Sequence, residues 1–180
     1  GLAGDVVFRI TEIPGLDGVW VTTAGGISRV RGGKVTNYGK ASGLPEVSTF
    51  EIVPDSGGSL WLTSTAGIHG VGAGQFDDID SGARKALSAK LYDVSSGLRD
   101  LPMSTAWSSR DSEGGLWFPT MGGVARLEPS GIPSNPVPPP VVIIDTVVVD
   151  GRRYPRSSKA ALAPDERRID VFFSALSFSA

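Results

Sequence analysis

The sequence predicts an all-β protein built from repeated small sheets. A tryptophan between apolar residues, followed by a threonine and a Gly-containing turn, occurs three times, at Trp20, Trp61 and Trp117. Glycine (24) and proline (13) are frequent, and few segments show a helical period, so we expect turns that join short strands. A unit of short strands that recurs about every 40 residues is typical of a β-propeller blade. The sequence therefore predicts propeller blades.

The first unit, residues 5–38, contains four strand candidates separated by turn residues. These candidates are residues 5–13, 19–23, 27–31 and 34–38. Glycine pairs and a Pro-Gly pair lie between them, and such pairs mark tight turns. Four strands joined in this way form a meander, which is one blade.

The second unit, residues 47–94, repeats the pattern with an insertion. Its strand candidates are residues 47–53, 60–64, 67–71 and 90–94. About fifteen extra residues lie before the last candidate, in excess of the blade repeat. Within them, Ser81 precedes an Ala/Arg/Lys/Leu stretch, which predicts a short helix capped by this serine.

The third unit covers residues 104–128, and the composition then changes. Residues 129–140 contain six prolines and are expected to form an extended linker. Strand candidates follow at 141–149, 152–154 and 168–178, with the character of an immunoglobulin-like β-sandwich. We therefore expect about three blades within residues 1–128 and the N-terminal strands of a sandwich, truncated, within residues 141–180. Three blades form an incomplete ring, since propellers take four to eight.

Composition excludes several classes of function. The formal net charge is −2 and the sequence pI about 5.4, so no basic surface indicates nucleic-acid binding. Cysteine is absent and His69 is the only histidine, which excludes thiolate and histidine-cluster metal sites. The longest apolar run, residues 141–149, is broken by Asp145 and is too short to span a bilayer. We expect no cofactor and no metal.

The repeated pattern Asp-x-x-Gly-Gly-x-Leu-Trp-x-x-(Ser/Thr), with variants, resembles the two-component regulator propeller repeat. It lies at residues 17–29, 55–68 and 111–126. Residues 135–149 (NPVPPPVVIIDTVVV) and 172–178 (FFSALSF) look like the opening of the three-tyrosine-motif (Y_Y_Y) sandwich domain that follows such propellers. The second unit departs from the pattern, with Ser59 before Leu60 and His69-Gly70 in place of the usual basic residue.

This resemblance implies an extracytoplasmic sensor region of a bacterial membrane receptor. In such receptors the sandwich leads to a transmembrane helix and then to a histidine kinase, hybrid kinase or diguanylate cyclase output. Several are thought to sense carbohydrate fragments. The expected location is the periplasmic part of an inner-membrane protein, attached to the membrane only through a segment outside these residues.

Most conspicuous side chains have a structural interpretation. Trp20, Trp61 and Trp117 share one repeat position and are expected to fill the space between blades. Trp107 lies outside that series; a core position is the simpler interpretation, and a ligand contact is the alternative. Asp17, Asp55 and Asp111 each begin a Gly-containing turn, which Asp favours through its own backbone. His69 is expected to be a solvated or packed strand residue.

A ligand site would lie where the connections between blades meet the loops that join the second and third strands. That face collects the segments 22–23, 47–49, 65–66, 103–105 and 120–121, which are rich in hydroxyls and suit neutral polar ligands. The candidate ligand-binding residues are Thr23, Ser48, Thr65, Ser104, Thr105, Trp107 and Met121. No catalytic residue is predicted.

Three functions remain in contention. The first is a non-enzymatic sensory region that binds a ligand, with an oligosaccharide as the expected partner. The second is a propeller lyase or hydrolase acting on polysaccharide or lactone-type substrates, for which the predicted mouth supplies no His, Glu or Lys. The third is a protein-interaction scaffold. Further blades of a longer protein, or a second copy in a homodimer, are expected to cover the open ends of the ring.

Overall fold

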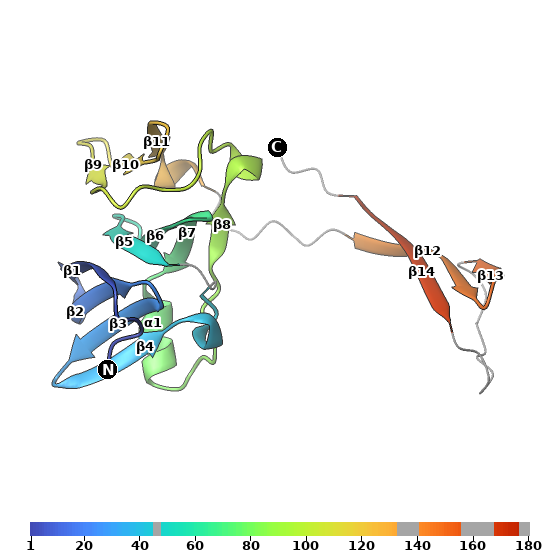
Figure 1. Cartoon of the computed structure of the whole chain (residues 1–180), viewed down its shortest axis with the longest axis horizontal. Helices are drawn as coiled ribbons and strands as arrows, with labels where there is room; N and C mark the ends of the chain where they lie inside the picture. The colour runs from blue at the N-terminus through green and yellow to red at the C-terminus, as the bar shows by residue number, and fades with distance from the viewer. Residues whose placement is uncertain (45–47, 133–140, 156–167, 177–180) are drawn as a thin grey trace. The chain divides into compact units, whose positions relative to one another are not determined.

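The computed structural model of the chain describes residues 1–44, 48–132, 141–155 and 168–176. The chain divides into two compact units, Gly1–Ile132 and Pro133–Ala180. The described residues form four antiparallel sheets and a single α-helix, and this confirms the predicted all-β class of blades and sandwich strands (Figure 1).

Two four-stranded meanders and one three-stranded meander make up the first unit. The first sheet has the order β1 (Val7–Ile13), β2 (Leu16–Thr23), β3 (Gly26–Arg31) and β4 (Lys34–Tyr38). The second has the order β5 (Thr49–Pro54), β6 (Ser59–Ser64), β7 (Gly67–Gly72) and β8 (Lys90–Tyr92). The third consists of β9 (Ser109–Arg110), β10 (Leu116–Pro119) and β11 (Val124–Leu127), with β10 in the middle. We call these sheets blades one, two and three.

Similar turns lead out of the first two blades. Single 3₁₀ turns, η1 (Lys40–Ser42) and η2 (Val94–Ser96), follow β4 and β8. Each ends at a glycine in the left-handed region, Gly43 (φ 83°) and Gly97 (φ 99°), a conformation that favours glycine. The Gly-Leu pairs of the sequence thus mark the exit from each of these blades.

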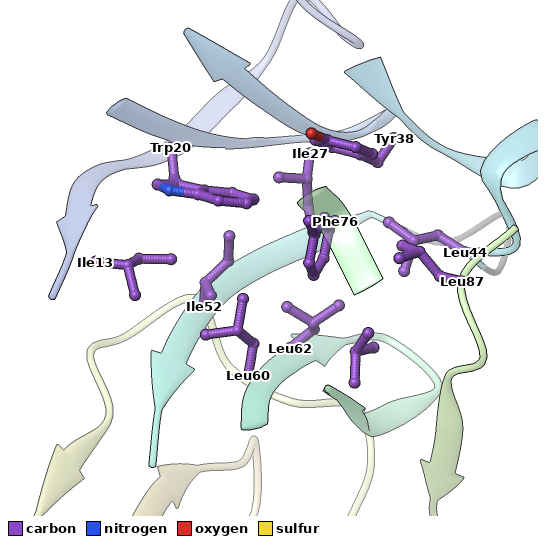
Figure 2. Close-up of a cluster of buried hydrophobic side chains, with 11 residues drawn as sticks. Ile13, Trp20, Ile27, Tyr38, Leu44, Ile52, Leu60, Leu62, Phe76 and Leu87 are labelled. Carbon is purple, nitrogen blue, oxygen red and sulfur yellow. The ribbon is translucent and has the colours of Figure 1, made fainter. Parts of the chain in front are cut away.

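The space between blades one and two is the larger core. Its buried side chains come from both sheets: Ile13, Trp20, Ile27, Tyr38, Leu44, Ile52, Leu60, Leu62, Val71, Phe76 and Leu87. Figure 2 shows Trp20, Ile27 and Tyr38 facing Ile52, Leu60 and Leu62 across the gap. The prediction that Trp20 fills the space between blades is confirmed.

Blades two and three are joined by a second cluster. Phe50, Trp61 and Ile68 pack there with Met103, Leu116 and Phe118. Trp61 is buried as predicted. Trp117, by contrast, is 40% exposed, so the prediction of a buried position is wrong for this copy. Among the described residues of Gly1–Ile132, no further sheet packs against its face of blade three.

The predicted helix exists but lies earlier in the chain. The structure forms α1 (Gly74–Asp80), and Ser81 is its C-cap residue and not its N-cap residue. The stretch 82–89 forms turns and irregular chain. The reason is tertiary: Phe76 on α1 is fully buried in edge-to-face contact with Trp20 and Tyr38, and such packing outweighs the helix propensity of an exposed segment.

The second unit is a three-stranded antiparallel sheet. Its order is β13 (Arg152–Pro155), β12 (Val141–Val149), β14 (Ile169–Leu176), and Asp150-Gly151 forms the β12–β13 turn with positive φ at both residues. Most of the predicted linker, residues 133–140, lies outside the described residues; its start forms the 3₁₀ turn η3 (Pro129–Gly131). No helix among the described residues is long and apolar enough to cross a membrane.

Candidate ligand-binding site

The first strands of the three blades present three different side chains at one equivalent position. The residue that pairs with the repeated tryptophan is Thr11 in blade one, Val53 in blade two and Ser109 in blade three. Two residues before these lie Arg9, Glu51 and Trp107, respectively. In a propeller the first strand of each blade is the innermost, so this position lies toward the axis. We call these three residues the first-strand cluster.

The first-strand cluster is held together by direct contacts between blades. Arg9 Nη1 lies 3.2 Å from Glu51 Oε1, and the Arg9 guanidinium carbon lies 4.5 Å from the centre of the Trp107 ring. The backbone amide of Ser108 donates to Glu51 Oε2 at 2.8 Å. Blades one, two and three therefore meet at a buried carboxylate whose two oxygens both have partners.

Trp107 is 76% exposed. The expectation that it is a core residue is therefore wrong. An exposed indole stacked on a guanidinium is a rigid, amphipathic surface that costs little conformational entropy to use in binding. The alternative interpretation of Trp107, a ligand contact, fits this geometry.

Several buried polar atoms around Glu51 have no hydrogen-bond partner. They are Thr63 Oγ1, on the residue paired with Glu51 across β5 and β6, Ser108 Oγ, and Arg9 Nη1, whose ion pair lacks hydrogen-bond geometry. Buried polar groups are nearly always satisfied by protein or water. Because these atoms are buried, an internal water is the partner that would satisfy them.

The sequence-predicted residues of blade one and its exit are mostly engaged in turns. Thr23 is buried and its hydroxyl donates to the Gly26 carbonyl at 3.0 Å. Ser48 is half-buried and donates to the Ala24 carbonyl at 3.3 Å, which brings it beside the same turn. Thr65 is exposed in the β6–β7 turn. Val47, in the same predicted face, lies outside the described residues.

The predicted residues of blade three lie on its surface. Ser104 is half-buried and its hydroxyl accepts from the Ala106 amide at 3.1 Å, while Thr105 is exposed. Met121 is exposed, and its amide donates to the Pro102 carbonyl at 3.1 Å. The connection thus runs against the β10–β11 turn, as Ser48 does against the β2–β3 turn in blade one.

Sequence reasoning missed Arg9 and Glu51. The signal that could have found them is the repeat itself: in an alignment of the three first strands they share a position with Trp107. An arginine and a glutamate at one position of neighbouring repeats suggest an ion pair between blades. Glu51 also corrects the expectation that the mouth of the propeller contains no glutamate.

The aspartates of the repeat act as turn residues and also hold the tryptophans. Asp55 Oδ1 accepts from the amides of Gly57 and Ser59, and its Oδ2 accepts from the Trp61 indole at 2.9 Å. Asp111 repeats the arrangement with Trp117 at 2.8 Å. The indole hydrogen bond, helped by backbone amides and Arg126, lowers the pKa of Asp111 to about 2.

His69 is a packed strand residue, as one of the two predicted alternatives stated. It is buried, and its Nε2 lies 3.1 Å from Ser64 Oγ. Burial lowers the pKa of His69, so the ring is neutral at physiological pH. Among the described residues no cluster of three or more His, Cys, Asp or Glu side chains could hold a metal ion.

Comparison with known proteins finds a solved structure with a similar fold. No family model and no curated protein matches the chain. A solved structure described as the extracellular domain of the hybrid two component system BT3049 from B. thetaiotaomicron is similar, with a TM-score of 0.61 and 19% sequence identity. The likeness shows the fold. It covers 94% of this chain but 20% of that chain, so these residues span a fifth of the structure that they match.

Proposed function

We propose that this chain is a ligand-binding, non-enzymatic part of the extracytoplasmic sensory region of a bacterial two-component-type receptor. The observation that carries the proposal is the first-strand cluster, in which the exposed Trp107 stacks on Arg9, and Arg9 is held by the buried Glu51. The fold shared with the extracellular domain of BT3049 supports the sensory role. In this proposal the sandwich strands relay binding toward a kinase or cyclase output.

The expected ligand is a neutral oligosaccharide. A sugar ring has an apolar face that suits the exposed indole of Trp107, and hydroxyls that suit polar side chains near it in the chain. Ser104 and Thr105 of the predicted site lie three and two residues, respectively, before Trp107 in the same segment. Further blades of a longer protein, or a second copy, would cover the outer faces of blades one and three.

The geometry of Glu51 favours binding over catalysis. A general acid or base needs a carboxylate free to reach the substrate. Both oxygens of Glu51 instead contact Arg9 and the Ser108 amide, and the residue is 5% exposed. Glu51 therefore orders the cluster that presents Trp107.

Calorimetric titration with a panel of neutral oligosaccharides tests the proposal. We expect at least one to bind, and Trp107→Ala to weaken it by about tenfold or more, as for other aromatic anchors of binding sites. The matched control is Trp117→Ala, also partly exposed but outside the cluster. Turnover of the oligosaccharide would refute the non-enzymatic role, and unchanged affinity in Trp107→Ala would refute the site. Binding of no oligosaccharide would favour a scaffold.

A further inference from the structure

Blade three ends in an open strand edge. In blades one and two the third strand pairs on its outer side with a fourth, β3 with β4 and β7 with β8. Among the residues that the structure describes, no strand pairs with the outer side of β11. An unpaired edge presents a row of backbone donors and acceptors that can template another strand.

The fourth strands of blades one and two share a tyrosine in one register. Tyr38 pairs with Ile27, and Tyr92 pairs with Ile68. Each tyrosine ring lies near the tryptophan of its blade, with ring centres 6.1 Å apart in blade one and 5.5 Å apart in blade two. Both isoleucines are fully buried.

The equivalent position on β11 is Val124. Trp117 pairs with Arg126 as Trp20 pairs with Arg29, so Val124, two residues earlier, corresponds to Ile27. Val124 is 66% exposed. An apolar residue that is covered in both other copies is thus uncovered in this one.

The glycine before that position also indicates that a fourth strand is missing from blade three. A Cβ on Gly26 or Gly67 would lie 2.3 Å from the carbonyl oxygen of Tyr38 or Tyr92, so these glycines make room for the fourth strand. Blade three keeps a glycine there, Gly123, yet nothing lies within 4 Å of its Cβ position. The chain has left room for a backbone that the described residues do not supply.

The surroundings of this edge are hollow and carry charges of both signs. A cavity of about 380 Å³ is lined by β11, Gly123 and the segment Gly97–Asp100. Counting along the strand, Glu128 corresponds to Arg31, which pairs with Lys34 at the start of β4. Glu128 already pairs with Arg126, but its side chain is 58% exposed. A lysine in that register would face it, and opposite charges directly across a strand pair are favourable.

We propose that the outer edge of β11 is a docking site for a β-strand of a partner polypeptide. The partner strand runs antiparallel, places a tyrosine opposite Val124 beside Trp117, and places a basic residue opposite Glu128. Main-chain hydrogen bonds supply affinity, and the aromatic and basic side chains supply register, as in other strand-addition sites.

A peptide that copies the chain's own fourth strand tests this proposal. The probe is a fluorescein-labelled Gly-Lys-Val-Thr-Asn-Tyr-Gly amide (residues 33–39), titrated with the full chain and followed by fluorescence anisotropy. We expect saturable binding that weakens about tenfold when alanine replaces the tyrosine. Gly123→Ala should weaken binding by a similar factor, because its Cβ would meet the tyrosine carbonyl and nothing in the chain itself.

Gly74→Ala is the matched control, since its Cβ also meets nothing within 4 Å and it lies away from β11. It should bind the peptide as the unmodified chain does. Equal affinity in Gly123→Ala, or no saturable binding, would overturn the proposal. A dimer of the unmodified chain that Gly123→Ala abolishes in size-exclusion chromatography would also overturn it, because a second copy would then be the occupant.

Discussion

Arg29 and Arg126 occupy the same repeat position, since they pair with Trp20 and Trp117, respectively, on the neighbouring strand. The two arginine side chains differ in how deeply they are buried. The Arg29 side chain is 1% exposed and bridges Asp77 at 2.5 Å and Asp80 at 3.3 Å. Arg126 is far more open and contacts Asp111 at 3.2 Å. Arg31 also contacts both aspartates, but its side chain is 43% exposed, so only Arg29 is buried against them. Removing one partner of a buried pair costs more than removing one partner of an exposed pair.

We therefore predict that Arg29→Met lowers the free energy of unfolding by about 3 kcal/mol. The matched variant Arg126→Met should lower it by less than about 1 kcal/mol. Urea unfolding followed by circular dichroism measures both values. Equal effects of the two substitutions would show that the ion pairs of α1 do not hold blade one.

His69 predicts a specific pH dependence of stability. Its pKa in the folded chain lies below the ordinary 6.5 because of burial, so on acidification the unfolded chain binds a proton first. Its contribution to stability is complete above about pH 6.5 and declines as the pH falls toward the folded-state pKa. As the sole histidine, it accounts for histidine titration in this range.

The substitution His69→Gln should remove this decline. Urea midpoints between about pH 7 and pH 5 should fall for the unmodified chain and remain nearly flat for the variant. An equal fall in both proteins would assign the effect to carboxylates and not to His69.

Single residues also show how far sequence reasoning reaches. The turn roles of Asp55 and Asp111 were predictable because each depends on neighbours within one repeat. The burial of Trp20 was predictable because the next repeat along the chain packs against it. The contact of Arg9 with Glu51 and Trp107 was not, because it depends on which residues of three separate strands share one register. The exposure of Trp107 follows from that same arrangement.

Among the elements, α1 joins two blades that each resemble an independent meander. It departs from blade two between β7 and β8, and packs Phe76 edge-on against both Trp20 and Tyr38 of blade one. The Tyr38 hydroxyl donates to Asp80 at 2.6 Å at the end of the helix. The insertion that interrupts the repeat thus connects blade two to blade one through side-chain contacts, and we call it the clamp. The length of the insertion alone did not predict these contacts.

Phe76→Ala tests the clamp. Loss of a fully buried phenylalanine costs about 3 to 5 kcal/mol, and here the loss should loosen blade one as well as blade two. Hydrogen exchange of the β2 and β3 amides should accelerate together with that of β6 and β7. Faster exchange confined to residues 74–89 would mean that the helix does not hold blades one and two together.

At the scale of the whole molecule, the repeat predicted the fold better than it predicted the completeness of each blade. Eleven of the fourteen described strands overlap a predicted strand range, and the other three form blade three, for which only the unit 104–128 was predicted. The predictions for blade three identified neither the missing fourth strand nor the exposure of Trp117. These features depend on what packs outside a repeat, and a repeat pattern describes only what lies inside it. The similarity to part of a larger extracellular domain fits a chain with open faces.

The central claim is that this fold presents Trp107 to a ligand, and nuclear magnetic resonance of the indole N–H groups tests it most directly. The chain has four tryptophans and so four indole signals, which Trp→Phe variants assign one by one. With the oligosaccharide that binds best, the account predicts a saturable shift of the Trp107 signal, while those of buried Trp20 and Trp61 stay in place. A shift of the Trp117 signal alone, or of none of the four, would contradict it.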